Sequence, residues 1–212
     1  HPNNWPAYFS KTKGCHVWDL DKNKFTDMSH MSVGTSSLGY CNSNIDNEVK
    51  LTVKRGNMST LNCPEKVELA EKLIELHPWA EMVRFARTGG EANSIAVRIA
   101  RACSGRDKIA ICGYHGWHDW YLASNLGDHT KLGEHLMAGL EPLGVPMNLA
   151  GTVYPFSFNR FDQLEEIVSQ TDLAAVKMEV QRSTPPHDGF LEKVRELCNK
   201  KGIVLIFDEC TS

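Results

Sequence analysis

The stretch Leu205-Ile-Phe-Asp-Glu-Cys-Thr-Ser212 decides the fold, because an apolar run that begins at Ile203 ends there on the acidic pair Asp208 and Glu209. A continuous aliphatic run of this kind is typical of a strand buried on both faces of a parallel sheet. Ligands bind such sheets at the carboxyl ends of their strands. Asp208 is therefore expected where chemistry takes place, although an acidic turn after a core strand explains these residues equally well.

Residues upstream of this strand alternate between short apolar strands and amphipathic helices. A helix is expected from Pro64 to just before Pro78, because apolar residues recur there at helical spacing. Further strands are predicted at residues 82–86, 109–112 and 174–179, and further helices at residues 91–103, 161–168 and 190–200. The alternation implies right-handed crossovers and a mostly parallel sheet with helices on both faces, so the fold class is α/β.

The N-terminal part lacks this alternation of strands and helices. Residues 14–27 predict a hairpin around Asp21-Lys22-Asn23, and residues 31–62 are expected to be mostly irregular, with a helical stretch at 45–53. We therefore assign residues 1–62 to an N-terminal segment and residues 63–212 to the first part of a large domain. The long, weakly periodic stretch 117–155 is expected to be a loop that covers an active site.

The composition is that of an ordinary soluble protein, with 212 residues, 42% of them hydrophobic and 23% charged. A formal net charge of -3 gives no reason to expect nucleic acid or an anionic membrane as a partner. No apolar stretch approaches the roughly 20 residues of a membrane span. Seven cysteines without a C-x-x-C pair favour reduced thiols and a cytoplasmic location. The chain begins at His1 without an initiator Met or a signal peptide, and is expected to be incomplete.

A pair of glycines marks the clearest anion-binding motif. The segment Arg84-Phe-Ala-Arg-Thr-Gly-Gly-Glu-Ala-Asn93 passes from an expected strand into a helix. Glycines allow a ligand to approach the backbone, and the free N–H groups and dipole of a helix N-terminus attract anions, so a phosphate site is expected here. The segment is neither G-x-G-x-x-G nor a Walker loop, and a simple Gly-Gly turn with Glu91 favouring the helix dipole remains the alternative.

Other strand ends also carry polar or aromatic residues. Gly113-Tyr-His-Gly-Trp-His-Asp119 follows one strand, and Glu179 ends the next. An aromatic ring beside a histidine can stack on a heteroaromatic ligand and carry a proton. His115, His118 and Asp119 could instead bind zinc, but the chain offers no further ligand at helical spacing, so no metal site is expected. A phosphorylated aromatic cofactor would use all of these strand ends together.

On these motifs the chain resembles the class III aminotransferases, pyridoxal-phosphate (PLP) enzymes of fold type I, and most closely the branch with glutamate-1-semialdehyde aminomutase. The resemblance covers essentially the whole chain. It rests on Val83-Arg-Phe-Ala-Arg-Thr-Gly-Gly-Glu-Ala-Asn93 against VRF-x-NSGTEAN, on Arg98-Ile-Ala-Arg-Ala-Cys-Ser-Gly-Arg-Asp-Lys-Ile109, on Tyr114-His-Gly-Trp-His-Asp119, and on Leu205-Ile-Phe-Asp-Glu-Cys210 against LIFDEV. It implies a truncated fold-type-I large domain behind an N-terminal hairpin segment.

The resemblance also implies PLP as cofactor and a role for each matching residue. Asp208 would pair with the pyridine nitrogen and keep it protonated, so that the ring can act as an electron sink. Tyr114 would stack on one ring face with His115 beside it, and Cys210 replaces the Val that packs on the other face. Glu179 would lie near the phenolic oxygen. The implied cofactor-binding residues are Thr88, Gly89, Gly90, Tyr114, His115, Glu179, Asp208 and Cys210.

Several positions depart from the family pattern. Thr88 stands where the family has Ser, Gly90 replaces a Thr that contacts the phosphate, and Val180 replaces a Pro. Val33 stands where the aminomutase has a substrate-site Trp, which favours another substrate. The lysine that forms the Schiff base follows the Asp-Glu motif in the family, beyond Ser212, and Lys177 precedes Glu179 and is not expected to replace it. The chain alone is therefore not expected to turn over.

These observations predict a PLP-dependent enzyme that transfers an amino group between an amino acid or amine and a carbonyl compound. Within the family, glutamate-1-semialdehyde 2,1-aminomutase is the alternative. A non-catalytic PLP-fold fragment without the Schiff-base lysine is an alternative of another class, whereas a nicotinamide-dependent dehydrogenase would need a glycine fingerprint that the chain lacks. The expected partners are a small-molecule amino donor, a carbonyl acceptor and a second copy of the chain. The substrate itself is not specified.

Overall fold

The computed structural model describes residues 6–31, 34–126, 141–181 and 183–210. The chain forms two compact units, His1–Val83 and Arg84–Ser212, and each is described by itself. Contacts thus group residues up to Val83 with the N-terminal unit, and the domain boundary set at residue 62 stays a prediction. Among the described residues, no helix is both long enough and apolar enough to cross a membrane.

The N-terminal unit contains an antiparallel sheet of order β1-β2-β3, formed by Phe9–Lys13, His16–Asp19 and Lys24–Thr26. The predicted hairpin is confirmed as β2 and β3. Its turn is closed by the Asp19 carboxylate, which accepts hydrogen bonds from the backbone N–H of Asn23 at 2.8 Å and from its Nδ2 at 3.0 Å. Strand β1 was not predicted, because Ser10-Lys-Thr-Lys13 is polar throughout and has no alternating pattern.

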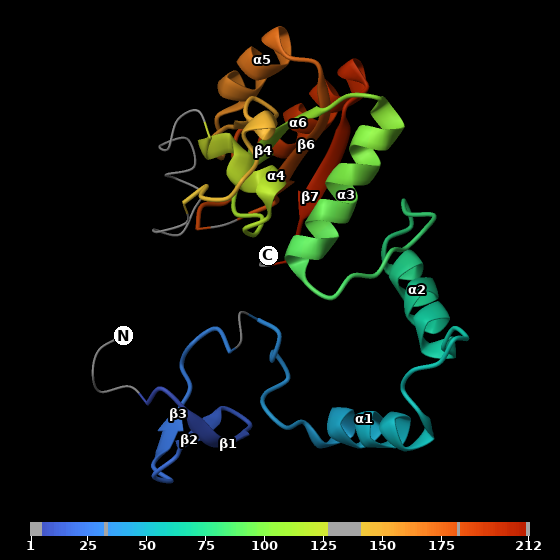
Figure 1. The fold of residues 1–212 in the computed structure, drawn as a ribbon, viewed down its shortest axis with the longest axis vertical. Helices are drawn as coiled ribbons and strands as arrows, with labels where there is room; N and C mark the ends of the chain where they lie inside the picture. Colours follow the sequence, from blue (N-terminus) through green and yellow to red (C-terminus); the bar gives the residue numbers. More distant parts are fainter. Residues whose placement is uncertain (1–5, 32–33, 127–140, 182, 211–212) are drawn as a thin grey trace. The chain divides into compact units, whose positions relative to one another are not determined.

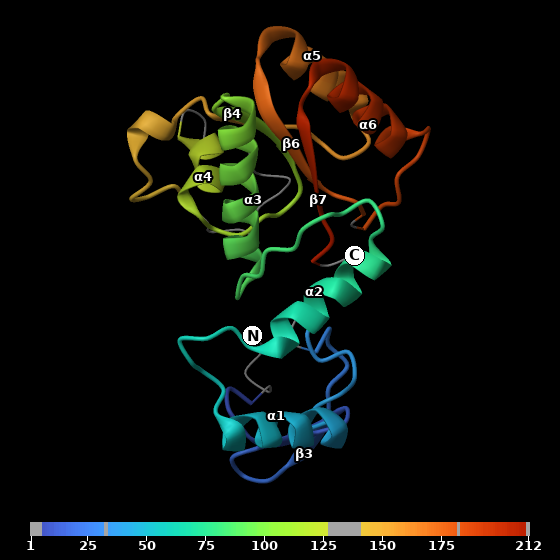
Figure 2. The ribbon, with the colours of Figure 1, turned by 90° about the vertical axis from the view of Figure 1, so that its right-hand side faces the viewer.

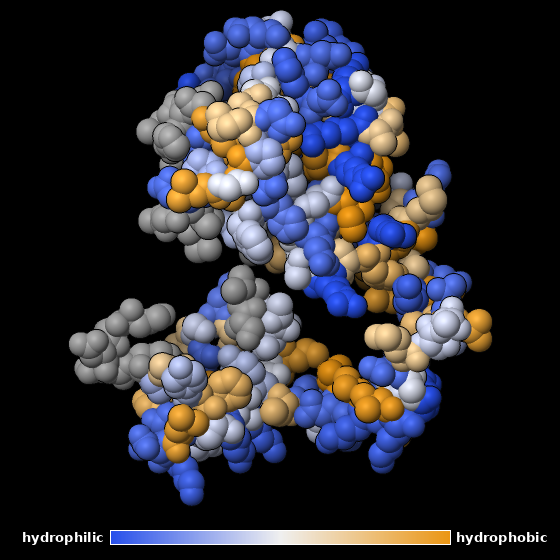
Figure 3. All heavy atoms as spheres, viewed as in Figure 1, coloured by the Kyte–Doolittle hydropathy of each residue, from blue (hydrophilic) through white to orange (hydrophobic). Residues whose placement is uncertain are grey.

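Two helices follow, α1 (Ser43–Arg55) and α2 (Pro64–Leu76), and both confirm predicted helices. The side chain of Asn42 caps α1, and Pro64 occupies the first turn of α2. Neither helix has a buried residue. Apolar side chains of α1 are exposed instead, and orange surface lies over this helix in Figure 3.

The C-terminal unit is a parallel sheet between helices (Figures 1 and 2). The strand order is β5-β4-β6-β7. The strands are β4 (Lys108–Cys112), β5 (Val153–Pro155), β6 (Leu173–Glu179) and β7 (Val204–Asp208). The helices are α3 (Gly89–Ser104), α5 (Phe161–Gln170) and α6 (Phe190–Lys201). The α/β class and the predicted mostly parallel sheet are confirmed.

Alternating residues of the central strands build two apolar layers. Ile109 and Ile111 of β4 pack in a cluster with Val97 of α3. Ala110 of β4 packs in the opposite cluster with Leu164 of α5, together with buried residues of α6. Because successive side chains of a strand point to opposite faces, α3 covers one face of the sheet and α5 and α6 cover the other.

Two expectations about the chain were wrong. Residues 82–86 form no strand, because a strand requires a neighbour to share ladder hydrogen bonds and no described segment pairs with them. The stretch 117–155 is not simply a covering loop. It contains the short helices α4 (Asp119–Leu122), η1 (Ala123–Asn125) and η2 (Met147–Leu149) and the edge strand β5, and its residues 120–125 are buried in the core. Residues 127–140 lie outside the described part.

The core layer under α5 gives a direct stability test. Leu164 is 0% exposed whereas Leu143 is 88% exposed. We expect Leu164→Ala to lower the free energy of unfolding by about 2–5 kcal/mol, because a cavity replaces buried methyl groups. The matched control Leu143→Ala should change it by less than about 0.5 kcal/mol. Urea unfolding followed by circular dichroism measures both, and equal effects would contradict the assigned core.

Candidate functional site

The carboxyl ends of three parallel strands and the N-terminus of α3 lie at one edge of the C-terminal unit. Strand β6 ends at Glu179, which is in register with Asp208 at the end of β7. Strand β4 ends at Cys112, and Gly113, Tyr114 and His115 follow it. Parallel strands place their carboxyl ends on the same edge, and this is why residues far apart in sequence meet here.

The start of α3 is organised by its cap. Thr88 is the N-cap residue, and its hydroxyl accepts a hydrogen bond from the backbone N–H of Glu91 at 3.2 Å. The Glu91 carboxylate accepts from the backbone N–H of Arg87 at 2.8 Å. Gly89 and Gly90 form the first turn of the helix, where backbone N–H groups have no partner within the helix. This turn therefore presents N–H donors and the positive end of the helix dipole.

Other segments approach these glycines so closely that side chains would not fit freely. A Cβ atom built on Gly90 would lie 2.9 Å from His118 Nε2, and one on Gly89 would lie 3.3 Å from Cys210 Sγ. A Cβ on Gly116 would lie 3.4 Å from the Cα of Gly90. The helix start is thus bordered by the segment after β4 and by the segment after β7.

Asp208 is the central charged group of the site. Its side chain is 8% exposed, and Oδ2 accepts hydrogen bonds from Asn93 Nδ2 at 2.9 Å, from His115 Nδ1 at 2.9 Å and from Lys177 Nζ at 3.1 Å. Oδ1 accepts from the backbone N–H of Cys210 at 3.2 Å. The carboxylate therefore joins α3, β6, β7 and the segment after β4.

These contacts set the ionisation of the cluster. Burial alone would raise the pKa of Asp208, but the hydrogen bond from His115 and the charge and hydrogen bond of Lys177 outweigh it, so the pKa lies well below its usual range. Burial lowers the pKa of Lys177, and the attraction of Asp208 opposes that shift. Asp208 is accordingly a stable carboxylate at the edge of the sheet.

His115 is buried and hydrogen-bonded to Asp208. It is 1% exposed, and its Nε2 lies 3.1 Å from the carbonyl oxygen of Cys112. Burial lowers the pKa of His115, the hydrogen bond to Asp208 raises it, and the charge of Lys177 lowers it further. Since both ring nitrogens face acceptors, Nδ1 must donate to the carboxylate, which is its stronger partner.

Glu179 fixes the segment after β4. Its Oε2 accepts a hydrogen bond from the backbone N–H of Tyr114 at 3.1 Å. Gly113 has φ +106°, and a Cβ built on it would lie 2.1 Å from that same oxygen, so glycine is required there. The half-buried Tyr114 ring packs edge-on against Tyr121, with ring centroids 6.2 Å apart. Glu179 thus positions the tyrosine that follows the strand.

Sequence reasoning missed several members of this site. Asn93 lies one helical turn after Gly89 and the motif contains it, but nothing in the sequence showed that it reaches Asp208. Lys177 was considered only as a nucleophile, and it is instead the ion-pair partner of Asp208. His118 contacts Ser94, whereas His115 contacts Asp208. Val33 lies outside the described residues.

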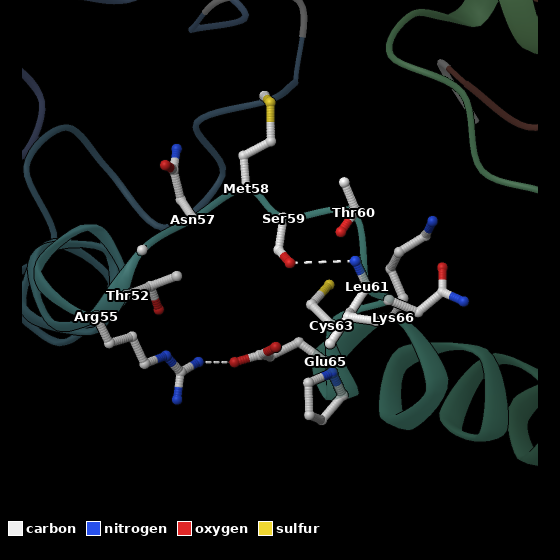
Figure 4. Close-up of a pocket in the computed structure, with 13 residues that line it drawn as sticks. Thr52, Arg55, Asn57, Met58, Ser59, Thr60, Leu61, Cys63, Glu65 and Lys66 are labelled. Atoms are coloured by element: carbon white, nitrogen blue, oxygen red, sulfur yellow. Dashed lines mark hydrogen bonds and ion pairs between the residues drawn. The ribbon is translucent and has the colours of Figure 1, made fainter.

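The N-terminal unit contains a separate hollow, lined by the segment between α1 and α2 (Figure 4). Its volume is about 630 Å³. Within it Arg55 pairs with Glu65, and Ser59 Oγ accepts from the backbone N–H of Leu61 at 3.1 Å. It shares no residue with the strand-end site. Of these two features, the strand-end site is the one that combines a helix start able to bind an anion with a buried carboxylate.

The ion pair between Asp208 and Lys177 can be tested by a double-mutant cycle. Asp208→Asn should lower the free energy of unfolding of the cofactor-free protein by about 3–5 kcal/mol, because it leaves Lys177 buried without its counter-charge. Adding Lys177→Met should recover most of that loss. Urea unfolding measures the cycle. Additive effects of the two substitutions would show that the pair is not coupled.

The stability lost in Asp208→Asn is expected to depend on pH. The pKa of Asp208 lies below that of an unfolded aspartate, about 3.9. Its ionisation therefore stabilises the fold above that pH, and the contribution is lost as the pH falls through the lowered pKa. The stability difference between wild type and Asp208→Asn should shrink below about pH 4. A difference that stays constant on acidification would contradict this.

Comparison with known proteins places the chain in a family. The family model for aminotransferase class-III matches residues 1–212. The chain is 34% identical over 223 residues to 3-aminobutyryl-CoA aminotransferase of Cloacimonas acidaminovorans, covering 100% of this chain and 49% of that protein. It is 35% identical over 211 residues to glutamate-1-semialdehyde 2,1-aminomutase of Methanothrix thermoacetophila, covering 97% of this chain and 48% of that protein.

Solved structures agree with the sequence relatives. A transaminase with PLP bound superposes with a TM-score of 0.84 at 28% identity, covering 99% of this chain and 50% of that chain. An omega-transaminase from Sphaerobacter thermophilus gives 0.83 at 28% identity, with 99% and 50% coverage. The chain spans about half the length of the curated relatives it matches. The expectation from the sequence motifs is confirmed, and the chain belongs to the class III aminotransferase family.

Proposed function

We propose that the whole protein containing this chain is a PLP-dependent aminotransferase that moves an amino group between an amino acid or amine and a carbonyl compound. The observation that carries the proposal is the Asp208 carboxylate, held ionised by three donors at the end of β7. Its place beside the N-terminus of α3 matches a ligand that has a phosphate at one end and a basic ring nitrogen at the other. Similarity to transaminases over the whole chain supports this reading.

The described residues fit such a cofactor. The N–H groups at Gly89 and Gly90 would hold the phosphate, because the first turn of α3 offers them no partner within the helix. Oδ1 of Asp208 accepts one hydrogen bond from Cys210, so this oxygen retains capacity for a second donor, the pyridine nitrogen. Tyr114 would face the ring, with Cys210 on the other side and Glu179 near the phenolic oxygen.

When bound, PLP supplies an electron sink for a carbanion next to the amino group. The chain contributes the charge that makes this effective: an ionised Asp208 favours a protonated ring nitrogen. Asn93 and His115 hold that carboxylate in place. Lys177 is committed to Asp208 in the core, so the lysine that the family joins to the cofactor is expected elsewhere in the whole protein.

Intramolecular transfer, as in glutamate-1-semialdehyde aminomutase, is the second candidate, and 35% identity to one such enzyme favours it. The departures at Val33, Gly90 and Val180 favour a transferase with another substrate. A binding protein without catalysis would follow if the rest of the protein supplied no cofactor lysine. The amino donor and the carbonyl acceptor are proposed to be small molecules.

A homodimer is proposed on the surface of α1. Ile45, Val49 and Val53 lie four residues apart on one helical face and are 52%, 56% and 59% exposed. A stripe of aliphatic side chains is normally covered by other protein. A second subunit is the proposed cover, in line with the family's shared active sites. The location is proposed to be cytoplasmic, in keeping with free cysteines at all seven positions.

The function is tested on the whole protein. Adding PLP should give a saturable change in visible absorption, borohydride should fix the cofactor to a lysine, and an amino donor should reverse the change. Asp208→Asn should bind PLP but transfer amino groups roughly 100-fold more slowly or worse, because the ring nitrogen loses its carboxylate. Absence of PLP binding, or full activity in this variant, would refute the proposal.

The dimer is tested by a charge on the α1 stripe. Val49→Asp should shift the whole protein toward a monomer in analytical ultracentrifugation, because dimerisation would bury an unpaired carboxylate. The adjacent Lys50→Asp, off the stripe, should leave the assembly unchanged. Equal behaviour of the two variants would assign the stripe to contacts within one subunit.

A further inference from the structure

Position 90 of the expected phosphate site is a glycine, where the resemblance to the family implies a threonine hydroxyl. The structure shows what occupies the space. Of the His118 ring atoms, Nε2 comes nearest to a Cβ built on Gly90, at 2.9 Å, while Cδ2 lies at 3.1 Å and Cε1 at 3.9 Å. A polar ring nitrogen thus lies where a threonine side chain would begin, and the two could not coexist without movement.

The orientation of the His118 ring is fixed by contacts at Nδ1, the ring nitrogen that does not face Gly90. His118 Nδ1 lies 2.9 Å from Oγ of Ser94, which is one helical turn after Gly90. The indole N–H of Trp120 donates to the same Oγ at 3.0 Å, and Trp120 is 8% exposed. The carbonyl oxygen of His118 accepts from the backbone N–H groups of Tyr121 and Leu122. Both the ring and its backbone are therefore anchored, with Nε2 directed toward the start of α3.

The hydrogen bonds also allow Nε2 to carry a proton in either charge state. Ser94 Oγ lies 2.9 Å from the carbonyl oxygen of Gly90 as well as 2.9 Å from His118 Nδ1. In the neutral ring the Ser94 hydroxyl can turn from the Gly90 carbonyl to donate to Nδ1, and Nε2–H is then the ring's donor. In the charged ring Nδ1–H donates to Ser94, whose hydroxyl then donates to Gly90, and Nε2–H again remains.

We propose that His118 replaces the missing hydroxyl and donates a hydrogen bond through Nε2 to the phosphate of the cofactor at the start of α3. The inference rests on the proposed function, because it assigns a further residue to the same cofactor site. Gly90 and His118 then form one unit: the absence of a side chain at position 90 admits the imidazole. Ser94 and Trp120 are positioning residues that act through His118.

The proposal predicts a loss that depends on the phosphate. In the whole protein, His118→Ala should raise the dissociation constant of PLP by roughly 10- to 100-fold, the effect of losing one hydrogen bond to a charged group. It should change that of pyridoxal, which lacks the phosphate, by less than about twofold. His118→Gln should restore part of the PLP affinity. Fluorescence titration measures both ligands without requiring activity.

A swap of the two positions sharpens the test. Gly90→Thr alone should weaken PLP binding, because the new side chain displaces the His118 ring. Combined with His118→Ala it should bind PLP better than His118→Ala alone, since the threonine hydroxyl then has room to reach the phosphate. His187→Ala, an exposed histidine on the loop before α6, is the matched control and should match wild type. Thermal unfolding verifies that each variant is folded.

The outcomes separate this inference from the proposed function. If wild type binds neither PLP nor pyridoxal, the proposed function fails and the inference falls with it. If wild type binds PLP and His118→Ala weakens PLP and pyridoxal equally, or neither, the inference alone is overturned. Failure of Gly90→Thr to improve the His118→Ala variant would show that the two positions do not share one contact.

Discussion

The Asp208 carboxylate is the constraint on which the rest of the site depends. A buried charge is tolerated only when hydrogen bonds and an opposite charge compensate its lost hydration. Here Asn93, His115 and Lys177 provide that compensation, each from a different segment of the chain. Packing brings the segments together, and the carboxylate specifies where their polar atoms lie. Order at the edge of the sheet and ionisation of the site therefore have a common cause.

Much of this architecture follows from the sequence. The parallel sheet was predicted from the apolar run that ends at Asp208 and from the alternation of strands with helices. The start of α3 was predicted from the glycine pair. The family motifs then predicted membership of the class III aminotransferases. Local patterns of this kind are readable because burial repeats with the period of each element.

Features that depend on distant contacts were not readable. Strand β5 has three residues and a proline, so its pattern is too short to detect, and its existence depends on pairing with β4. Residues 82–86 have a strand-like composition but no partner among the described residues. The pairing of Lys177 with Asp208 and of Ser94 with His118 requires knowledge of which elements are neighbours. The composition of a segment does not show which elements lie beside it in the fold.

Lys177 also has a consequence for folding specificity. In β6 the residues Ala175, Lys177 and Glu179 alternate with Val176 and Met178, which pack in the apolar layer under α5 and α6. A shift of β6 by one residue would move the Lys177 ammonium group into the apolar layer. It would also leave the Asp208 carboxylate without its counter-charge. Misregistered pairings of β6 are thereby strongly disfavoured, so a polar pair beneath the site also selects the correct strand alignment.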